Sequence, residues 1–198
     1  VLLHPGRGDA ARESAATHTG ALAGDWEVMR LKVDRAGVIV VKTLEELGDV
    51  SELLLRCPPM APGGAVVLTE SGAWKALTLD LAEDIGLPLP HLSDANAPAL
   101  RAAMPEFVAV SNPVDLTAQA LVDPDLYRRT IEALLGDDRF SSIMLSIIQT
   151  DPATAKIKFP PITEALRKLK PQKPVLFAGI DDGAEVPAEY VAALREIG

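Results

Sequence analysis

The sequence is poor in several residue types, and each shortage excludes a class of protein. A single cysteine, Cys57, among 198 residues excludes a disulfide framework within the chain and fits a reducing compartment, so we expect a cytoplasmic protein. Aromatic residues make up only 4%, which favours helices packed on a parallel sheet over an aromatic-rich β-sandwich. No apolar run approaches the roughly 18 residues that a membrane span needs, and no signal peptide is recognisable.

Cations are also scarce, since 19 Lys and Arg face 28 Asp and Glu and the net charge is −9. Such a chain has no basic surface for a phosphate backbone, so we expect neither nucleic acid nor membrane as a partner. Hydrophobic residues make up 48% and charged residues 24%, as in an ordinary globular protein. The chain opens with Val1 in an expected strand, which indicates a piece of a longer protein.

Helix and strand patterns alternate from residue 25 onward. Strands are expected at 38–41, 65–69, 142–148 and 174–178, with shorter extended pieces at 87–89 and 108–110. Helices are expected at 25–36, 44–54, 96–104, 162–170 and 187–197, after Ser71 and after the Asp123–Pro124 pair, whereas 57–64 and 151–161 are expected loops. The alternation predicts an α/β fold, a doubly wound and mostly parallel sheet with right-handed crossovers.

The first 24 residues differ from the rest because they are small, polar and rich in Gly and Ala. We expect them to be a loop that belongs with a preceding domain, with a second domain over 25–198. His18 lies there between Thr and Gly residues, and an imidazole can carry a phosphoryl group or act as a base. A surface histidine with no role explains the same residues.

Two later segments combine loop residues with polar side chains. Ser71 and Gly72 follow a strand and open a helix, which suits a phosphate at the helix N-terminus or simply an N-cap with a tight turn. Asn112 and Asp115 lie in Ser-Asn-Pro-Val-Asp-Leu, either a structural turn or part of the same sheet edge. No His, Cys and Asp grouping has the spacing of metal ligands, so no metal site is expected.

Together these motifs resemble one family. Gly6-Arg7, followed by Ala-Ala-Thr-His-Thr-Gly-Ala-Leu-Ala-Gly over 15–24, resembles the phosphohistidine segment of NDP-forming acyl-CoA synthetases, the succinyl-CoA synthetase-like superfamily that includes ADP-forming acetate–CoA ligases. Ser71-Gly72 and Asn112-Pro113-Val114-Asp115-Leu116 resemble the motifs of the flavodoxin-like domain that follows. The three motifs occur in the family's order, and the resemblance covers nearly the whole chain.

The resemblance implies an acid–CoA ligase that acts through a phosphohistidine at His18. It implies that Gly20, Ser71 and Gly72 bind phosphate, with Asn112 and Asp115 in support. It also implies that ATP-grasp and CoA-binding domains lie elsewhere in this or another chain, and that homo-oligomers can form. No cofactor is expected to bind tightly, because CoA, the carboxylic acid and ATP/ADP with Mg²⁺ are substrates of the whole enzyme.

Two other functions fit the same residues. One is a non-catalytic ligase-like domain of a protein-lysine acetyltransferase, in whose relatives the phosphorylated histidine is often lost. The other is a ligand-binding α/β module without phosphoryl chemistry. The retained His18 favours the ligase, whereas His4-Pro5 before the Gly-Arg pair and Ala73-Trp74 after Ser71-Gly72 depart from the family pattern.

Overall fold

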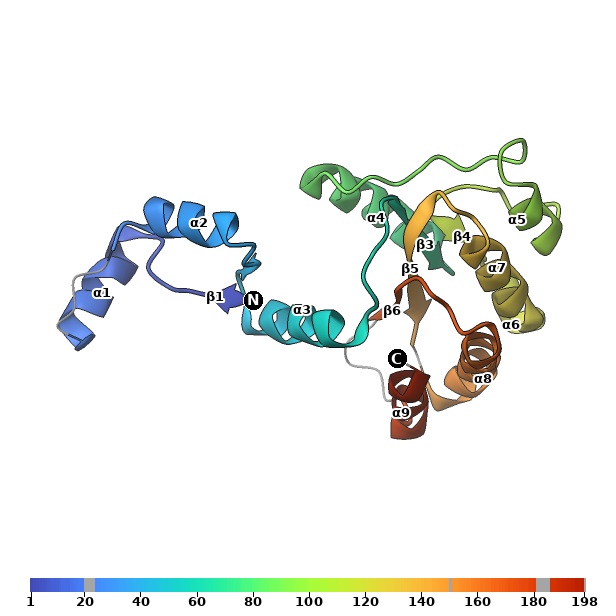
Figure 1. Ribbon diagram of the computed structural model, residues 1–198. Helices are drawn as coiled ribbons and strands as arrows, with labels where there is room; N and C mark the ends of the chain where they lie inside the picture. Colours follow the sequence, from blue (N-terminus) through green and yellow to red (C-terminus); the bar gives the residue numbers. More distant parts are fainter. Residues whose placement is uncertain (20–23, 150, 181–185, 198) are drawn as a thin grey trace. The chain divides into compact units, whose positions relative to one another are not determined.

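The computed structural model describes residues 1–19, 24–149, 151–180 and 186–197, which form two compact units, Val1–Arg56 and Cys57–Gly198 (Figure 1). The sequence favoured a division after residue 24, whereas these units divide after Arg56. The reason is that β1 (Leu2–Leu3) pairs in parallel with β2 (Val40–Val41), so the opening residues share a sheet with the segment that follows them.

The first unit also contains α1 (Asp9–Thr19), α2 (Trp26–Arg35) and α3 (Leu44–Arg56). The prediction of a loop over 1–24 is therefore wrong for residues 9–19, which form α1. The alanines of this segment favour a helix, and an ion pair joins Asp9 and Arg12 in its first turn. Thr43 and Glu46 have the spacing of a capping box before α3, and the N–H of Glu46 donates to Thr43 Oγ1 over 3.1 Å.

The second unit is built on a four-stranded sheet. Its strands are β3 (Gly64–Thr69), β4 (Val114–Asp115), β5 (Phe140–Ile148) and β6 (Val175–Ile180), in the order β4-β3-β5-β6. Every neighbouring pair is parallel, which confirms the predicted α/β class and doubly wound sheet. The extended pieces expected at 87–89 and 108–110 are not strands, and the edge strand falls instead at β4.

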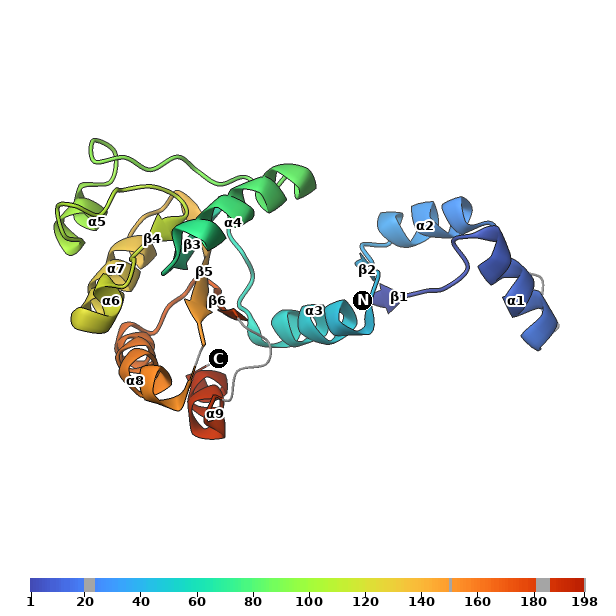
Figure 2. The same ribbon diagram turned by 180° about the vertical axis from the view of Figure 1, so that it is seen from behind.

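Helices cover both faces of this sheet. Figures 1 and 2 show α4 (Gly72–Ile85) on one side and α6 (Gln119–Val122), α7 (Asp125–Leu135) and α8 (Pro152–Leu169) on the other. Two further helices are α5 (Pro98–Ala103), which packs on α7, and α9 (Ala188–Ile197), which packs on α8. The core lies on the α7 and α8 side, where Ile143, Leu145 and Ile147 of β5 are fully buried.

Helix α8 occupies a segment that the sequence assigned to a loop. Pro160 and Pro161 predicted a loop over 151–161 because an internal proline removes a helical hydrogen bond. The helix nevertheless runs from Pro152, and Asp151 caps it by accepting from the N–H of Ala153 and Thr154. Burial of one helix face, which includes Phe159, outweighs the local cost of the prolines.

Helix α4 leaves its main apolar stripe in solvent. The spacing of Trp74, Leu77, Leu81 and Ile85 in the sequence predicts one helical face, and these side chains are 39%, 55%, 60% and 65% exposed. The buried position of this helix is instead Ala82, at 5% exposure. The stripe therefore adds little to the core of this unit, and substitutions along it are expected to change stability only slightly.

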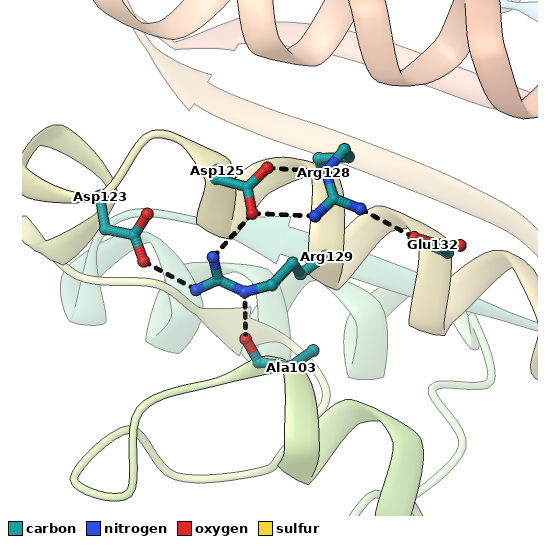
Figure 3. A network of polar contacts seen from close by, with 6 residues as sticks. All are labelled: Ala103, Asp123, Asp125, Arg128, Arg129 and Glu132. Atoms are coloured by element: carbon teal, nitrogen blue, oxygen red, sulfur yellow. Dashed lines mark hydrogen bonds and ion pairs between the residues drawn. The ribbon is translucent and has the colours of Figure 1, made fainter.

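The start of α7 is held by charged side chains (Figure 3). Arg128 and Arg129 both donate to Asp125, with Arg128 Nε 2.6 Å from Asp125 Oδ1 and Arg129 Nη1 2.9 Å from Asp125 Oδ2. Arg129 also donates to Asp123 Oδ2 over 2.7 Å and to the carbonyl of Ala103 over 3.2 Å. Asp123 was expected to cap α7, but its carboxylate is used by Arg129, so the network ties α5 to α7.

This network predicts an acid-dependent loss of stability. The hydrogen bond from Arg128, aided by Arg129, lowers the pKa of Asp125 from 3.8 to about 2. A carboxyl with a depressed folded pKa stabilises the fold above its ordinary pKa, and this contribution is lost as the pH falls through about 2.

Urea unfolding of the wild type and Asp125→Asn between pH 5 and pH 2 measures this contribution. We expect the free energies of unfolding of the two proteins to converge as the pH falls, because the difference comes from the ionised carboxylate. Asp138→Asn, which removes an exposed carboxylate beyond the far end of α7, is the matched control. Parallel pH curves for wild type and Asp125→Asn would show that the network contributes nothing through Asp125.

Candidate functional site

Two of the predicted phosphate-binding residues, Ser71 and Gly72, lie at the carboxyl end of β3. Ser71 is the N-cap of α4, and its Oγ accepts from the N–H of Trp74 over 3.5 Å. Gly72 follows with no side chain, and a Cβ built there would lie 3.5 Å from Asp115 Oδ2. Asp115 pairs with Thr69 across the β3–β4 ladder. The structure therefore brings Ser71, Gly72 and Asp115 together at one sheet edge, as the sequence predicted.

The polarity of this edge differs from that of a simple anion site. The first-turn N–H groups of α4 favour a negative group. Asp115 opposes one, since its Oδ1 accepts from the N–H of Thr117 over 2.9 Å and its Oδ2 lies toward Gly72. Glu70 adds a second carboxylate directly before Ser71. The edge thus presents both hydrogen-bond donors and carboxylates. It suits a ligand that carries a negative group and a hydrogen-bond donor.

Glu70 and Lys158 form a buried ion pair beside this edge. Both side chains are 5% exposed, and Lys158 Nζ lies 2.8 Å from Glu70 Oε2. The ammonium also donates to the carbonyl of Ile148 over 2.8 Å, and the N–H of Ile148 donates to Glu70 Oε2 over 3.1 Å. The pair therefore joins the ends of β3 and β5 to α8.

Burial raises the pKa of the Glu70 carboxyl above its ordinary value of 4.5, and the charge of Asp115 raises it further. The hydrogen bond and charge of Lys158, together with the N–H of Ile148, act in the opposite direction. Because a raised folded pKa favours the protonated form, the contribution of Glu70 to stability is greatest below pH 4.5 and declines as the pH rises. Burial therefore makes the ionised form of Glu70 costly, and Lys158 and the N–H of Ile148 offset part of that cost.

Asn112 has the structural position that the sequence left open, and not the place at the carboxyl edge that the resemblance implied. Its Nδ2 donates to the carbonyls of Ala65 over 2.9 Å and Pro90 over 3.2 Å, and its Oδ1 accepts from the N–H of Val67 over 3.2 Å. These bonds hold Ala65 and Val67 of β3, before its carboxyl end. Asn112 precedes the two-residue strand β4, so its side chain faces the backbone of β3 and serves as a structural bridge.

His18 lies in the other compact unit, in the last turn of α1, and its side chain is exposed. Gly20 lies outside the described residues. The same unit contains an open hollow of about 370 Å³, lined by Arg7, Arg12, Gly24, Asp25, Trp26 and Glu27. An exposed imidazole is free to react with a phosphoryl donor, which meets the first requirement of a phosphoryl carrier.

The sequence analysis missed Glu70 and Lys158. Glu70 falls within the segment that was singled out for Ser71, but its side chain was not considered. The signal was available, because Val66 and Leu68 are core residues and alternation in a strand puts Glu70 on the same face. A carboxylate at a core-facing position predicts a buried partner. Lys158 was hidden by the loop expected at 151–161.

The described residues contain neither a cluster of metal ligands nor a helix that could span a membrane. Within the ranges that the structure describes, no three His, Cys, Asp or Glu side chains are grouped so as to hold a metal ion. Among those same residues, none of the helices has the length and apolarity that crossing a membrane requires.

Comparison with known families gives two matches in chain order. Residues 1–54 match the family described as succinyl-CoA ligase like flavodoxin domain. Residues 65–195 match the family described as Ligase-CoA domain. The break between these matches lies close to the division between the two compact units after Arg56.

Known proteins similar to the chain are CoA ligases and synthases. A trans-feruloyl-CoA synthase, FCS1, from an unknown prokaryotic organism is 53% identical over all of this chain, which spans 28% of that protein. The alpha subunit of an ADP-forming acetate–CoA ligase I from Pyrococcus furiosus is 32% identical over 91% of the chain, or 39% of the subunit.

A solved structure shares the fold. It is the dinucleotide forming acetyl-coenzyme A synthetase 1 of Ca. Korarchaeum cryptofilum in complex with phosphate and ADP, with a TM-score of 0.79 and 24% identity. The match covers 96% of this chain and 40% of that one. The chain therefore spans well under half the length of the proteins that it resembles.

Proposed function

Because the chain belongs to the Ligase-CoA domain family, we propose that it is part of an NDP-forming acid–CoA ligase. The whole enzyme makes an acyl-CoA from a carboxylic acid, CoA and a nucleoside triphosphate. The observation that carries the proposal is the exposed imidazole of His18, in the segment that matches the succinyl-CoA ligase like flavodoxin domain.

In the proposed reaction, His18 attacks the terminal phosphorus of the nucleotide, and the nucleoside diphosphate leaves. The acid carboxylate then takes the phosphoryl group from His18 and becomes an acyl phosphate. The CoA thiolate attacks the acyl carbon, and inorganic phosphate leaves. A covalent carrier of this kind divides one difficult transfer into easier steps.

Ser71 and Gly72 bind a phosphate group in this proposal, through the N–H groups of the first turn of α4. Asp115 supports the same edge, and Asn112 supports it indirectly by holding β3. By the resemblance to NDP-forming acyl-CoA synthetases, the nucleotide and its Mg²⁺ are assigned to an ATP-grasp domain, and CoA to a separate binding domain.

For the acid substrate, we infer an aromatic acid of the ferulate type. The support is the 53% identity to a trans-feruloyl-CoA synthase over the whole chain, against 32% to an acetate–CoA ligase subunit. Other parts of the enzyme also recognise the acid. The inference therefore names a class of acid, the aromatic acids, and not one compound.

The full-length enzyme that contains this chain tests the proposal. It is incubated with ATP, CoA and either ferulate or acetate, and the acyl-CoA and nucleotide products are separated by chromatography. We expect feruloyl-CoA and ADP in equal amounts, with little acetyl-CoA. Release of AMP would contradict the NDP-forming reaction. Transfer of acetyl groups from acetyl-CoA to protein lysines, without any acyl-CoA formation, would support the acetyltransferase alternative instead.

A further inference from the structure

The buried Glu70–Lys158 pair lies where this type of sheet binds ligands. The chain passes from β3 to β4 on one side and then to β5 on the other side of β3. In doubly wound sheets, ligands bind outside the carboxyl ends of the strands at such a switch point. Glu70 directly follows β3, and Ile148 is the last residue of β5. The pair therefore lies at the switch point itself.

The contacts of the pair are unevenly divided between the two carboxylate oxygens of Glu70. Lys158 Nζ and the N–H of Ile148 both donate to Oε2, over 2.8 Å and 3.1 Å. Oε1 is buried and has no hydrogen-bond partner in the described part of the chain. A buried carboxylate oxygen without a donor is rare in native structures, and it is explained when a ligand supplies the donor.

The charge around Oε1 restricts what that ligand can be. Glu70 carries one carboxylate, and Asp115 on the neighbouring strand end adds a second that acts on it electrostatically. An anionic group next to Oε1 would be repelled by both. A neutral N–H or O–H group, in contrast, supplies the missing donor and adds no negative charge.

We propose that Glu70 Oε1 accepts a hydrogen bond from a neutral N–H or O–H group of a substrate held at the ends of β3 and β5, and that Lys158 is the positioning residue that orients this carboxylate. The inference rests on the proposed function for the choice of substrates. Two of them supply such donors, namely the amide groups of the pantetheine arm of CoA and the phenolic hydroxyl of a ferulate-type acid.

A double variant separates this role from a structural one. Lys158→Met alone leaves Glu70 buried without its cation, so we expect a lower melting temperature. Glu70→Met combined with Lys158→Met removes both charges and the acceptor oxygens and keeps similar side-chain volumes, so it is expected to melt close to the wild type. The double variant nevertheless lacks the oriented carboxylate. Lys156→Met, at an exposed position of the same helix, is the matched control.

In the full-length enzyme, we expect the double variant to raise the KM of one substrate at least about tenfold, the effect of losing one hydrogen bond to a charged group. The KM of the other substrate is expected to stay unchanged. A rise for CoA identifies the pantetheine amide as the donor, and a rise for ferulate identifies the phenol. Unchanged KM values for both substrates in a stable double variant would show that the pair is only structural.

The isolated chain gives a test that is independent of activity. The N–H of Ile148 donates to Glu70, so its NMR resonance reports on ligands at this carboxylate. We expect pantetheine or ferulate to shift it in the wild type but not in the double variant. A shift caused by inorganic phosphate bound at Ser71 and Gly72 is expected to be equal in the two proteins. A phosphate shift in the wild type alone, or no shift with pantetheine or ferulate, overturns the inference. If the wild-type enzyme makes no acyl-CoA, the proposed function fails and this titration still decides the role of Glu70.

Discussion

Replacing His18 by alanine is expected to abolish transfer of the terminal phosphate of ATP to the full-length enzyme. In the proposal, His18 supplies the enzyme side chain that forms a bond to phosphorus, and alanine offers no nucleophile in its place. Formation of acyl-CoA is expected to fall by roughly three orders of magnitude or more, as when other covalent catalytic groups are removed. The measurement is incorporation of labelled phosphate, quenched in alkali, beside the rate of acyl-CoA formation.

The stability of this variant should hardly change, because the side chain of His18 is exposed. A loss of labelling can therefore be read as a loss of chemistry. His91→Ala is the matched control, since His91 is also exposed and its backbone carbonyl, which the substitution keeps, accepts from Asn96. Labelling of His18→Ala at the level of the wild type would remove the phosphoryl carrier from the proposal.

The alternation of helix and strand was enough to predict the sheet of the second unit. Buried parallel strands are continuous apolar runs, and 65–69 and 142–148 stand out in the sequence for that reason. The edge strand β4 could not be located in this way, because it has two residues and no periodicity. Its place is set by its pairing with β3, which is a tertiary contact.

The largest differences have separate physical causes. Prolines predicted a loop where α8 continues, and the helix persists because its buried face packs on the sheet. A Gly- and Ala-rich composition predicted a loop where α1 forms, but the glycines lie outside this helix and its alanines favour it. The division after Arg56 depends on the pairing of β1 with β2, residues that are far apart in the sequence.

The candidate site was predictable only in part, namely where the order of the strands places residues together. Ser71, Gly72 and Asp115 follow strands, and parallel strands end at a common edge, so their proximity follows from topology. The resemblance placed Asn112 at that edge, whereas its side chain bonds to Ala65 and Val67 within β3. The Glu70–Lys158 pair joins residues 88 positions apart, and no local pattern indicates which cation meets a buried carboxylate.

Phe159→Ala is expected to cause the largest loss of stability among the substitutions considered. The ring is fully buried, and it lies 5.3 Å from the ring of Phe177 in β6 and 5.2 Å from that of Tyr190 in α9. Removing a large buried aromatic ring costs about 3–5 kcal/mol, because apolar contacts are lost and a cavity remains. The measurement is the free energy of unfolding from urea denaturation, compared with the wild type.

Ile157→Ala is the matched control, because Ile157 lies two residues earlier in α8 and is 41% exposed. We expect this control to cost about 1 kcal/mol or less, since a half-exposed side chain leaves no closed cavity. The contrast tests the helix itself, because only a helical backbone puts Phe159 against β6 and α9 while Ile157 faces solvent. Equal losses for the two variants would mean that residues 151–161 form the solvated loop that their prolines suggested. Lys158 would then have no rigid element to hold it against Glu70.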